Sequence, residues 1–238
     1  MAKLKNSVVL ITGADGGLGQ SLVKECVKLG AKKIYATGLN VERLSLLEEK
    51  YQVVRSMVLD VTNLDAIKSL HKTTSDTNIL INNAGIEKRT GFLDELSIPS
   101  AEIEMKVNYI GVLNMCNTYV PTILEHESGA IVNILSIGGL LIVPHLATYC
   151  ASKVAAHFLT EGLRYSLKET SILVSGVYAG YIKTEMTKGM DVEKSSPDYV
   201  AKEIMNSIEG DQTHIYPDPM SQKYSSKLHD KVMIINLK

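Results

Sequence analysis

Near its beginning the chain reads Val8-Val9-Leu10-Ile11-Thr12-Gly13-Ala14-Asp15-Gly16-Gly17-Leu18-Gly19. The four apolar residues predict a buried strand, and the apolar spacing over Leu18–Leu29 predicts a helix directly after the glycines. Glycines permit a tight turn and let the backbone approach a phosphate closely, while the following helix offers free N–H groups. The spacing is Gly-x-x-x-Gly-x-Gly rather than Gly-x-Gly-x-x-Gly, so this segment alone leaves open a simple turn or a phosphate-binding loop.

Strand-like and helix-like segments alternate through the rest of the chain. Further strands are expected at Lys33–Thr37, Val53–Leu59, Ile79–Ile81, Ala130–Leu135, Ile172–Val177 and Thr213–Tyr216. Helices are expected at Val41–Lys50, Leu64–Lys72, Ala101–Leu124, Thr148–Lys168 and Pro197–Ile208. The strands are continuous apolar runs, which is typical of strands covered by helices on both faces. The alternation therefore predicts one α/β domain on a doubly wound parallel sheet, with functional groups beyond the carboxyl ends of its strands.

Composition narrows the class of function. The 238 residues suit a single domain spanning 1–238, and 45% hydrophobic with 21% charged residues is ordinary for a globular protein. A net charge of -1 does not favour nucleic acid or an anionic membrane, and neither a signal peptide nor a membrane span is expected. The three cysteines and six histidines lack metal-ligand spacing, so we expect no metal site and a reducing, cytoplasmic location. The aperiodic stretch 181–197 is expected to form a substrate lid.

Two further strand ends carry small or polar residues. Asn82-Asn83-Ala84-Gly85 follows the fourth strand and either leaves room for a nucleoside or is simply a turn. Asp60-Val61 ends the third strand, where the acid can accept a hydrogen bond from an adenine amino group or cap the next helix through Thr62 or Asn63. Neither segment is decisive alone.

The most informative group of residues comes later in the chain. Ser136 ends the fifth strand, and Tyr149 and Lys153 lie four residues apart in a predicted helix, hence on one helical face. A tyrosine phenol has a pKa of about 10, and a nearby cation favours its ionised form. Such a phenol can take a proton from an alcohol or give one to a developing alkoxide, while Ser136 orients the same oxygen. A tyrosine and a lysine at this spacing are by themselves common on solvated helix surfaces.

Three motifs taken together are more specific. The chain resembles the classical short-chain dehydrogenase/reductase family in Thr12-Gly13-x-x-x-Gly17-x-Gly19, in Asn82-Asn83-Ala84-Gly85, and in Ser136 followed by Tyr149-x-x-x-Lys153. The resemblance covers about Lys5 to Tyr216. It implies a Rossmann-like sheet of about seven strands in the order 3-2-1-4-5-6-7 and an NAD(P)(H) cofactor. It also implies a homodimer or homotetramer built through the two long helices.

The resemblance further implies the roles of individual residues. The catalytic residues are expected to be Asn108, Ser136, Tyr149 and Lys153, with Asn108 holding a water that relays protons from Lys153. The cofactor-binding residues are expected to be Gly13, Asp15, Gly16, Gly17, Leu18, Gly19, Gly38, Leu39, Asp60, Val61, Asn83, Ala84, Gly85, Tyr149, Lys153, Gly180, Ile182 and Thr184. Substrate contacts are expected from Ser136, Gly138, His145, Tyr149 and Tyr181. Cys150 is expected to point away from the site as a small core residue.

Two positions depart from the family pattern. Ala179-Gly180 stands where a Pro-Gly turn is usual, which predicts a slightly looser turn that still leaves room for the nicotinamide. The second strand ends at Gly38-Leu39, without the acid that binds the ribose of NAD and without an arginine that favours NADP. The absent acid removes the main barrier to a 2′-phosphate and Arg43 can reach across, so the sequence slightly favours NADP(H).

The sequence thus predicts an oxidoreductase that moves a hydride between NAD(P)(H) and a small to medium, mostly apolar carbonyl or alcohol, with Tyr149 as general acid/base. The segment 138–146 is apolar, and Met186 and Met190 stand in the predicted lid. The alternative is a catalytically silent NAD(P)-binding sensor or scaffold of the same fold, whose expected signature is loss of Tyr149 or Lys153. A lyase of the halohydrin dehalogenase type is disfavoured, because that type replaces the lysine by arginine and gives up the glycine motif.

Overall fold

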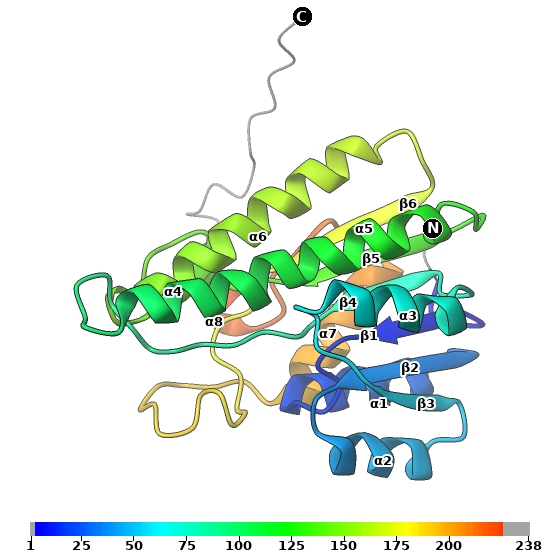
Figure 1. Ribbon diagram of the computed structural model, residues 1–238, viewed down its shortest axis with the longest axis horizontal. Coiled ribbons are helices and arrows are strands. Elements are labelled where there is room, and N and C mark those ends of the chain that lie inside the picture. Colours follow the sequence, from blue (N-terminus) through cyan, green and yellow to red (C-terminus); the bar gives the residue numbers. More distant parts are fainter. Residues whose placement is uncertain (1–2, 226–238) are drawn as a thin grey trace, which may run out of the picture.

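A computed structural model describes residues 3–225 of the chain (Figure 1). Seven parallel strands form one sheet in the order β3-β2-β1-β4-β5-β6-β7. The strands are β1 (Val8–Ile11), β2 (Lys33–Gly38), β3 (Val54–Val58), β4 (Ile79–Asn82), β5 (Gly129–Ile134), β6 (Ile172–Val177) and β7 (His214–Ile215). The predicted doubly wound sheet and its strand order are confirmed.

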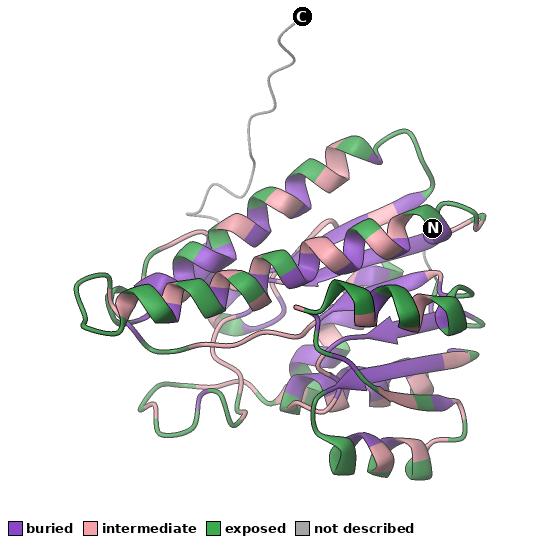
Figure 2. Ribbon diagram, in the orientation of Figure 1, coloured by how far each residue is buried: buried purple, intermediate pink, exposed green. Residues whose placement is uncertain are grey.

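Helices cover both faces of the sheet. They are α1 (Gly17–Lys28), α2 (Val41–Lys50), α3 (Leu64–Thr74), α4 (Ser97–Met105), α5 (Val112–Ile123), α6 (Ala147–Ser166), α7 (Pro197–Glu209) and α8 (Pro219–Ser225). One core cluster joins the sheet to α1, α2 and α7, and the other joins it to α3 and α5, as Figure 1 also shows. Figure 2 accordingly shows the strands buried and the outer helix faces exposed.

The first strand explains why continuous apolar runs were needed. Val9 and Ile11 belong to the core cluster on one face, whereas Val8 and Leu10 belong to the cluster on the other. Successive side chains of a strand point to opposite faces, so a strand covered twice needs apolar residues at every position. The four residues of β1 are all buried for this reason.

The long helix predicted at Ala101–Leu124 is more complex than the sequence suggested. It begins earlier, as α4, passes through a π-helical turn at Lys106–Gly111, and continues as α5. Asn108 lies in that turn, where a wider helical ring changes the direction of its side chain. Pro121, inside α5, lies in the last turn of that helix.

The segments beyond the carboxyl ends of the strands differ in regularity. Residues 181–197, the expected lid, hold one isolated bridge between Ile182 and Ser195 and otherwise lack regular structure before α7. Helix α8 was not predicted, although Asp218 before Pro219 is a typical helix start, and the Asp218 carboxylate accepts a hydrogen bond from Ser221 N at 2.9 Å. Among residues 3–225, no helix has the length and apolar character needed to cross a membrane.

The approach of α1 to the glycine loop leaves no room for a side chain at Gly19, and this is testable. A Cβ on Gly19 would come within 2.1 Å of the Gly13 carbonyl oxygen, which is backbone and cannot rotate away. We expect Gly19→Ala to lower the free energy of unfolding by about 1–3 kcal/mol or more, measured by urea denaturation. The matched control is Gly162→Ala in α6, where nothing lies within 4 Å, and which should instead stabilise by about 0.5–1 kcal/mol. Equal effects of the two substitutions would contradict the crowding at Gly19.

Candidate active site

One cavity of about 570 Å³ lies beyond the carboxyl ends of the strands, between the loops after them, the segment 181–187 and α8. This is where ligands bind in open parallel sheets. Its wall contains most of the residues singled out from the sequence. These are Gly13, Asp15, Gly16, Gly17, Leu18, Gly19, Gly38, Leu39, Asp60, Val61, Asn83, Ala84, Gly85, Ser136, Gly138, Tyr149, Lys153, Gly180, Tyr181, Ile182 and Thr184.

The glycine loop leaves space and an uncapped helix start at the cavity wall. Gly13 has φ +62, and a Cβ there would come within 2.9 Å of Ala84 Cα, so only glycine fits. Helix α1 begins at Gly17 after Gly16, and among the described residues no side chain caps it. Its first N–H groups and positive dipole end therefore remain available to an anion at the cavity wall.

Thr12 joins the loops after β1 and β4. Its hydroxyl oxygen accepts hydrogen bonds from Asn83 N and Ala84 N, both at 3.0 Å. The Asn83 side chain returns two bonds from Nδ2, to Thr12 O and Gly13 O at 2.9 Å. Asn83 thus holds the glycine loop in place with its side chain, a role that sequence reasoning missed.

Ser136, Tyr149 and Lys153 converge at the other end of the cavity. The Lys153 Nζ atom lies 5.6 Å from the centroid of the Tyr149 ring and donates a hydrogen bond to Ile134 O at 2.9 Å. The Ser136 hydroxyl accepts from Gly138 N at 3.0 Å and interacts with the Tyr149 phenol. The i,i+4 spacing therefore brings phenol and amine to one helix face, at the end of β5.

Burial opposes the charge of both groups. It raises the pKa of Tyr149 well above its ordinary value, a shift that the Ser136 hydroxyl only partly offsets. It lowers the pKa of Lys153 from 10.5 to about 8, because Nζ is withdrawn from water. The shift of Tyr149 runs opposite to the expectation that Lys153 would favour the ionised phenol, because burial is its largest cause. A phenol with a raised pKa keeps its proton and is able to donate it.

Asn108 is buried behind the cavity wall. Its side chain accepts from Ile86 N and donates to Ile86 O, both at 2.9 Å, and donates to Ser152 Oγ at 2.9 Å. Its Oδ1 and the Lys153 Nζ both flank Gly85, since a Cβ there would lie 3.2 Å from the one and 3.5 Å from the other. The structure thus brings Asn108 next to Lys153 without exposing it in the cavity.

Two residues around Tyr149 lie differently from their predicted positions. His145 is exposed and lies outside the cavity wall formed by the described residues, whereas its neighbours Val143 and Leu146 are part of that wall. Cys150 belongs to the wall, and a Cβ on Gly138 would come within 3.2 Å of its sulfur, so the prediction that it points away was wrong. Burial raises the pKa of the Cys150 thiol.

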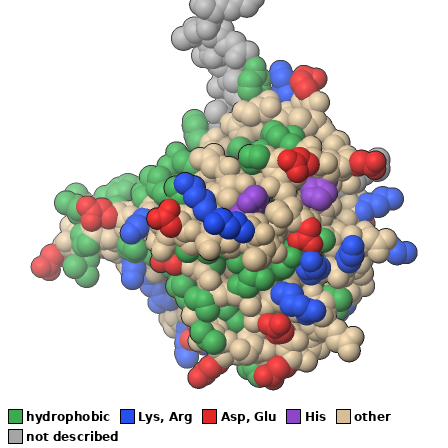
Figure 3. Space-filling view, turned by 45° about the vertical axis from the view of Figure 1, so that its right-hand side comes forward, with side chains coloured by type: hydrophobic (Ala, Val, Ile, Leu, Met, Phe, Trp, Pro, Cys, Tyr) green, Lys and Arg blue, Asp and Glu red, His purple; other side chains and the backbone are tan. Residues whose placement is uncertain are grey.

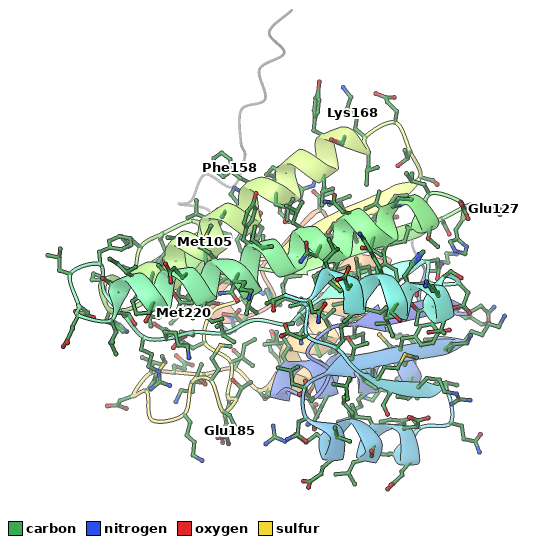
Figure 4. All side chains as sticks on the ribbon, in the orientation of Figure 1. Met105, Glu127, Phe158, Lys168, Glu185 and Met220 are labelled. Atoms are coloured by element: carbon green, nitrogen blue, oxygen red, sulfur yellow. The ribbon has the colours of Figure 1, made fainter. Side chains whose placement is uncertain are left out.

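The turn after β6 is held more firmly than Ala179-Gly180 suggested. The Gly180 N–H donates to Asp218 Oδ2 at 2.8 Å, and a Cβ on Gly180 would come within 2.7 Å of Oδ1 of the same carboxylate. Met220 and Tyr224 of α8 complete this part of the cavity wall, opposite Glu185 of the lid (Figure 4 labels Met220 and Glu185). The sequence offered Asp218 before Pro219 as the signal for this helix.

An acid also lines the mostly apolar substrate end. The Glu87 side chain is 5% exposed, and burial raises its pKa, partly offset by Arg89. Glu104 lies nearby and is fully buried; its Oε1 accepts from Lys88 N, and its Oε2 has no hydrogen-bond partner among the described residues. Both carboxylates add to the cost of ionising Tyr149.

The same loop contacts the segment 181–197. Arg89 Nη2 donates to Met186 O at 2.6 Å and to Lys188 O at 2.9 Å, and its Nε lies 3.2 Å from Glu87 Oε1. Arg89 has φ +52, a conformation that residues other than glycine seldom adopt without tertiary contacts to hold it. Arg89 therefore joins the loop after β4 to a segment that lines the cavity.

A carboxylate from the loop after β1 lies at the end of β2. The Asp15 carboxylate accepts hydrogen bonds from Leu39 N and Asn40 N, at 3.0 and 2.8 Å. The prediction that no acid stands near Gly38 was therefore wrong, because it considered only residues adjacent in sequence. Asp60 accepts a hydrogen bond from Thr62 N at 2.8 Å. The N-cap of α3 is Asn63, which accepts from Ala66 N at 3.0 Å, so Asp60 braces the turn before α3 and does not itself cap the helix.

The burial of Lys153 predicts a pH-dependent stability. Its folded pKa of about 8 lies below 10.5, so burying the ammonium costs stability in full below pH 8, and this cost disappears as the pH rises towards 10.5. Lys153→Met removes this cost at every pH. Without ligands, the unfolding free energy of the variant relative to the wild type should therefore fall by roughly 1–3 kcal/mol as the pH rises from about 8 towards 10.5. Urea denaturation of both proteins at several pH values measures it. A difference that stays constant with pH would show that Nζ is solvated.

The Arg89 contacts predict a lid that opens more often when they are lost. Arg89→Ala removes two hydrogen bonds from a charged donor, so cleavage by trypsin after Lys188 should accelerate by on the order of tenfold. Arg55→Ala is the matched control, because the hydrogen bonds of Arg55 within residues 3–225 go to the carbonyls of Gln52 and Val54 beside it. If both variants are cleaved at the wild-type rate, Arg89 does not hold the lid.

Comparison with known proteins agrees with this geometry. A family model described as short chain dehydrogenase matches residues 7–195. An uncharacterized oxidoreductase of Staphylococcus saprophyticus is 30% identical over 200 residues, covering 80% of this chain and 85% of the relative. A short chain dehydrogenase of Burkholderia cenocepacia, solved in complex with NADP, superposes with a TM-score of 0.89 at 32% identity, covering 94% of this chain and 93% of that one. The chain belongs to the short-chain dehydrogenase family, whose oxidoreductase members depend on a nicotinamide cofactor.

Proposed function

We propose that this chain transfers a hydride between NAD(P)(H) and the carbon of a carbonyl or alcohol, with Tyr149 as the general acid/base. The observation that carries the proposal is one continuous cavity, which joins the glycine loop and α1 N-terminus at one end to Ser136, Tyr149 and Lys153 at the other. This places a space suited to a phosphate-bearing cofactor next to groups that can handle a proton. In family members, hydride transfer uses this pair of neighbouring sites.

The residues present suit a nicotinamide dinucleotide. Gly13 and Gly17 border a space that a Cβ would obstruct, and the uncapped start of α1 suits a pyrophosphate. Asn83-Ala84-Gly85 would line the adenine-side ribose, and Lys153 would bond the nicotinamide ribose. Ile182 and Thr184, both in the wall, would contact the carboxamide. When bound, the nicotinamide ring gives or accepts the hydride.

The chain's own residues handle the proton. In the reducing direction, the protonated Tyr149 phenol donates to the carbonyl oxygen as negative charge develops there. The Ser136 hydroxyl donates a hydrogen bond to the same oxygen, and the Lys153 ammonium favours the phenolate that remains. Asn108 is proposed to position a water through which Lys153 returns the proton to solvent. In the oxidising direction the same groups act in reverse.

The substrate is proposed to be a small to medium, mostly apolar carbonyl or alcohol. Leu141, Val143, Leu146 and Met186 supply apolar wall around Tyr149, and Gly138 and Tyr181 lie close to it. Glu87 is the polar exception, and it suits a substrate that carries a hydrogen-bond donor away from the reacting oxygen. The chain 1–238 is proposed to be a single domain, with 181–197 as its substrate lid. Its proposed location is the cytoplasm.

The cofactor is NAD(H) or NADP(H). The Burkholderia cenocepacia relative was solved in complex with NADP, which supports the slight preference for NADP(H) that the sequence favoured. The Asp15 carboxylate at the end of β2 weighs in the opposite direction.

A homodimer or homotetramer is proposed, built through the α4–α5 segment and α6. These helices expose Ile103, Ile110, Val154 and Phe158, which are large apolar side chains without cover in the single chain. Figure 3 shows apolar side chains gathered on the projection at the left of that view. Burying such residues against a second copy would stabilise the assembly.

A catalytically silent NAD(P)-binding sensor is the second candidate. The buried Lys153 beside the half-buried Tyr149 weighs against it, because keeping an amine out of water costs stability. The two candidates differ in one measurement. Loss of cofactor absorbance at 340 nm with any member of a carbonyl panel supports the enzyme, and tight binding without turnover supports the sensor.

The Tyr149→Phe variant tests the proton donor. It removes only the hydroxyl, so turnover of a carbonyl substrate should fall by on the order of 100- to 10,000-fold while the Kd of the cofactor changes by less than about threefold. Tyr165→Phe on the same helix is the matched control and should turn over like the wild type. Wild-type turnover by the Tyr149 variant would remove Tyr149 from this role.

A further inference from the structure

The end of β2 is shaped around a carboxylate from another loop. Gly38 is the last residue of β2, and a Cβ placed on it would come within 2.0 Å of Asp15 Oδ1 and 2.4 Å of Asp15 Cγ. No residue with a side chain can therefore stand at position 38 while Asp15 keeps this conformation. Gly38 has no side chain, and the Asp15 carboxylate occupies the space that a side chain at position 38 would need.

The carboxylate also occupies the anion-binding donors at this edge. Asp15 Oδ2 accepts from both Leu39 N and Asn40 N, and Asn40 is the N-cap of α2. Successive backbone N–H groups in a turn can together bind a phosphate. Here they already bind an anion that belongs to the chain. A phosphate at this position could not bind the N–H groups of Leu39 and Asn40, because Asp15 already accepts from them, and the Asp15 charge would repel it.

The neighbouring charges do not cancel that acid. Arg43 lines the same wall, but its Nη1 approaches the backbone oxygen of Asp15, at 3.5 Å, and its side chain is exposed. Asp60 adds a second carboxylate to this end of the wall, and Glu42 stands in the first turn of α2. One solvated guanidinium thus shares this end of the wall with two carboxylates, those of Asp15 and Asp60.

We infer that Asp15 selects against a 2′-phosphate, so that this chain binds NAD(H) in preference to NADP(H). A carboxylate accepts hydrogen bonds from the hydroxyls of an adenosine ribose and repels a phosphate in their place. The inference rests on the proposed function and names a specificity-determining residue within it. It reverses the slight preference for NADP(H) drawn from the sequence, which found no acid after β2 because the acid comes from the loop after β1.

Calorimetric titration of the full chain with NADH and with NADPH tests this without any turnover. The wild type should bind NADH more tightly by on the order of tenfold or more. Asp15→Asn keeps the size of the side chain and one acceptor but removes the charge. It should tighten NADPH binding by on the order of tenfold and leave the Kd of NADH within about threefold.

Glu42→Gln is the matched control, because it removes one negative charge from the exposed start of α2 outside the cavity wall. It should leave the ratio of the two dissociation constants unchanged. A shift as large as that of Asp15→Asn would assign the effect to general charge and overturn the role of Asp15.

A second measurement on the wild type remains informative if Asp15→Asn loosens the glycine loop. Added KCl screens a repulsion, so it should bring the affinity for NADPH closer to that for NADH. If Arg43 attracts the 2′-phosphate instead, the same salt weakens NADPH relative to NADH. Wild-type NADPH binding equal to or tighter than NADH binding overturns the inference and leaves the proposed function standing. Absence of binding by either dinucleotide overturns both.

Discussion

The whole site depends on the hydrogen bonds that join the loops after β1 and β4. Thr12 receives two backbone N–H groups on its hydroxyl, and Asn83 returns two bonds from its amide to the backbone of Thr12 and Gly13. All four bonds lie at the carboxyl edge of adjacent parallel strands, where backbone groups have left the sheet ladder and need new partners. This contact fixes the glycine loop relative to the rest of the cavity, and α1 then follows with no space between it and the loop.

Burial favours the neutral form of both groups proposed to handle the proton. The phenol of Tyr149 resists ionisation and the amine of Lys153 gives up its proton more readily than in water. Each would ease the charge of the other, because phenolate and ammonium lie within one helical turn. Such a site favours neutral groups until a proton is transferred to the substrate oxygen, which suits acid/base chemistry near neutral pH.

Each end of the cavity carries an acid from a loop that the sequence did not place there. At the glycine-loop end, the Asp15 carboxylate accepts hydrogen bonds from the backbone after β2, and we propose that it selects the cofactor. At the Tyr149 end, Glu87 follows β4 and pairs with Arg89, whose guanidinium also donates to the carbonyls of Met186 and Lys188. One side chain therefore contacts both an acid of the wall and the segment 181–197.

The sequence by itself determined the sheet, its order, and the presence of the glycine loop, Ser136, Tyr149 and Lys153 at its carboxyl edge. The strands, the helices and the spacing of residues within one helix follow from local rules. The strand order and the grouping of these motifs in one site followed from the resemblance to the short-chain dehydrogenase/reductase family. Only the tertiary structure decided where side chains from separate loops meet. It put Asp15 at Gly38, turned Cys150 into the wall, left His145 outside it, inserted a π-helical turn at Asn108, and added α8 through Asp218. The physical reason is that periodicity is fixed by neighbours along the chain, whereas side-chain direction at a sheet edge depends on contacts between segments far apart in sequence.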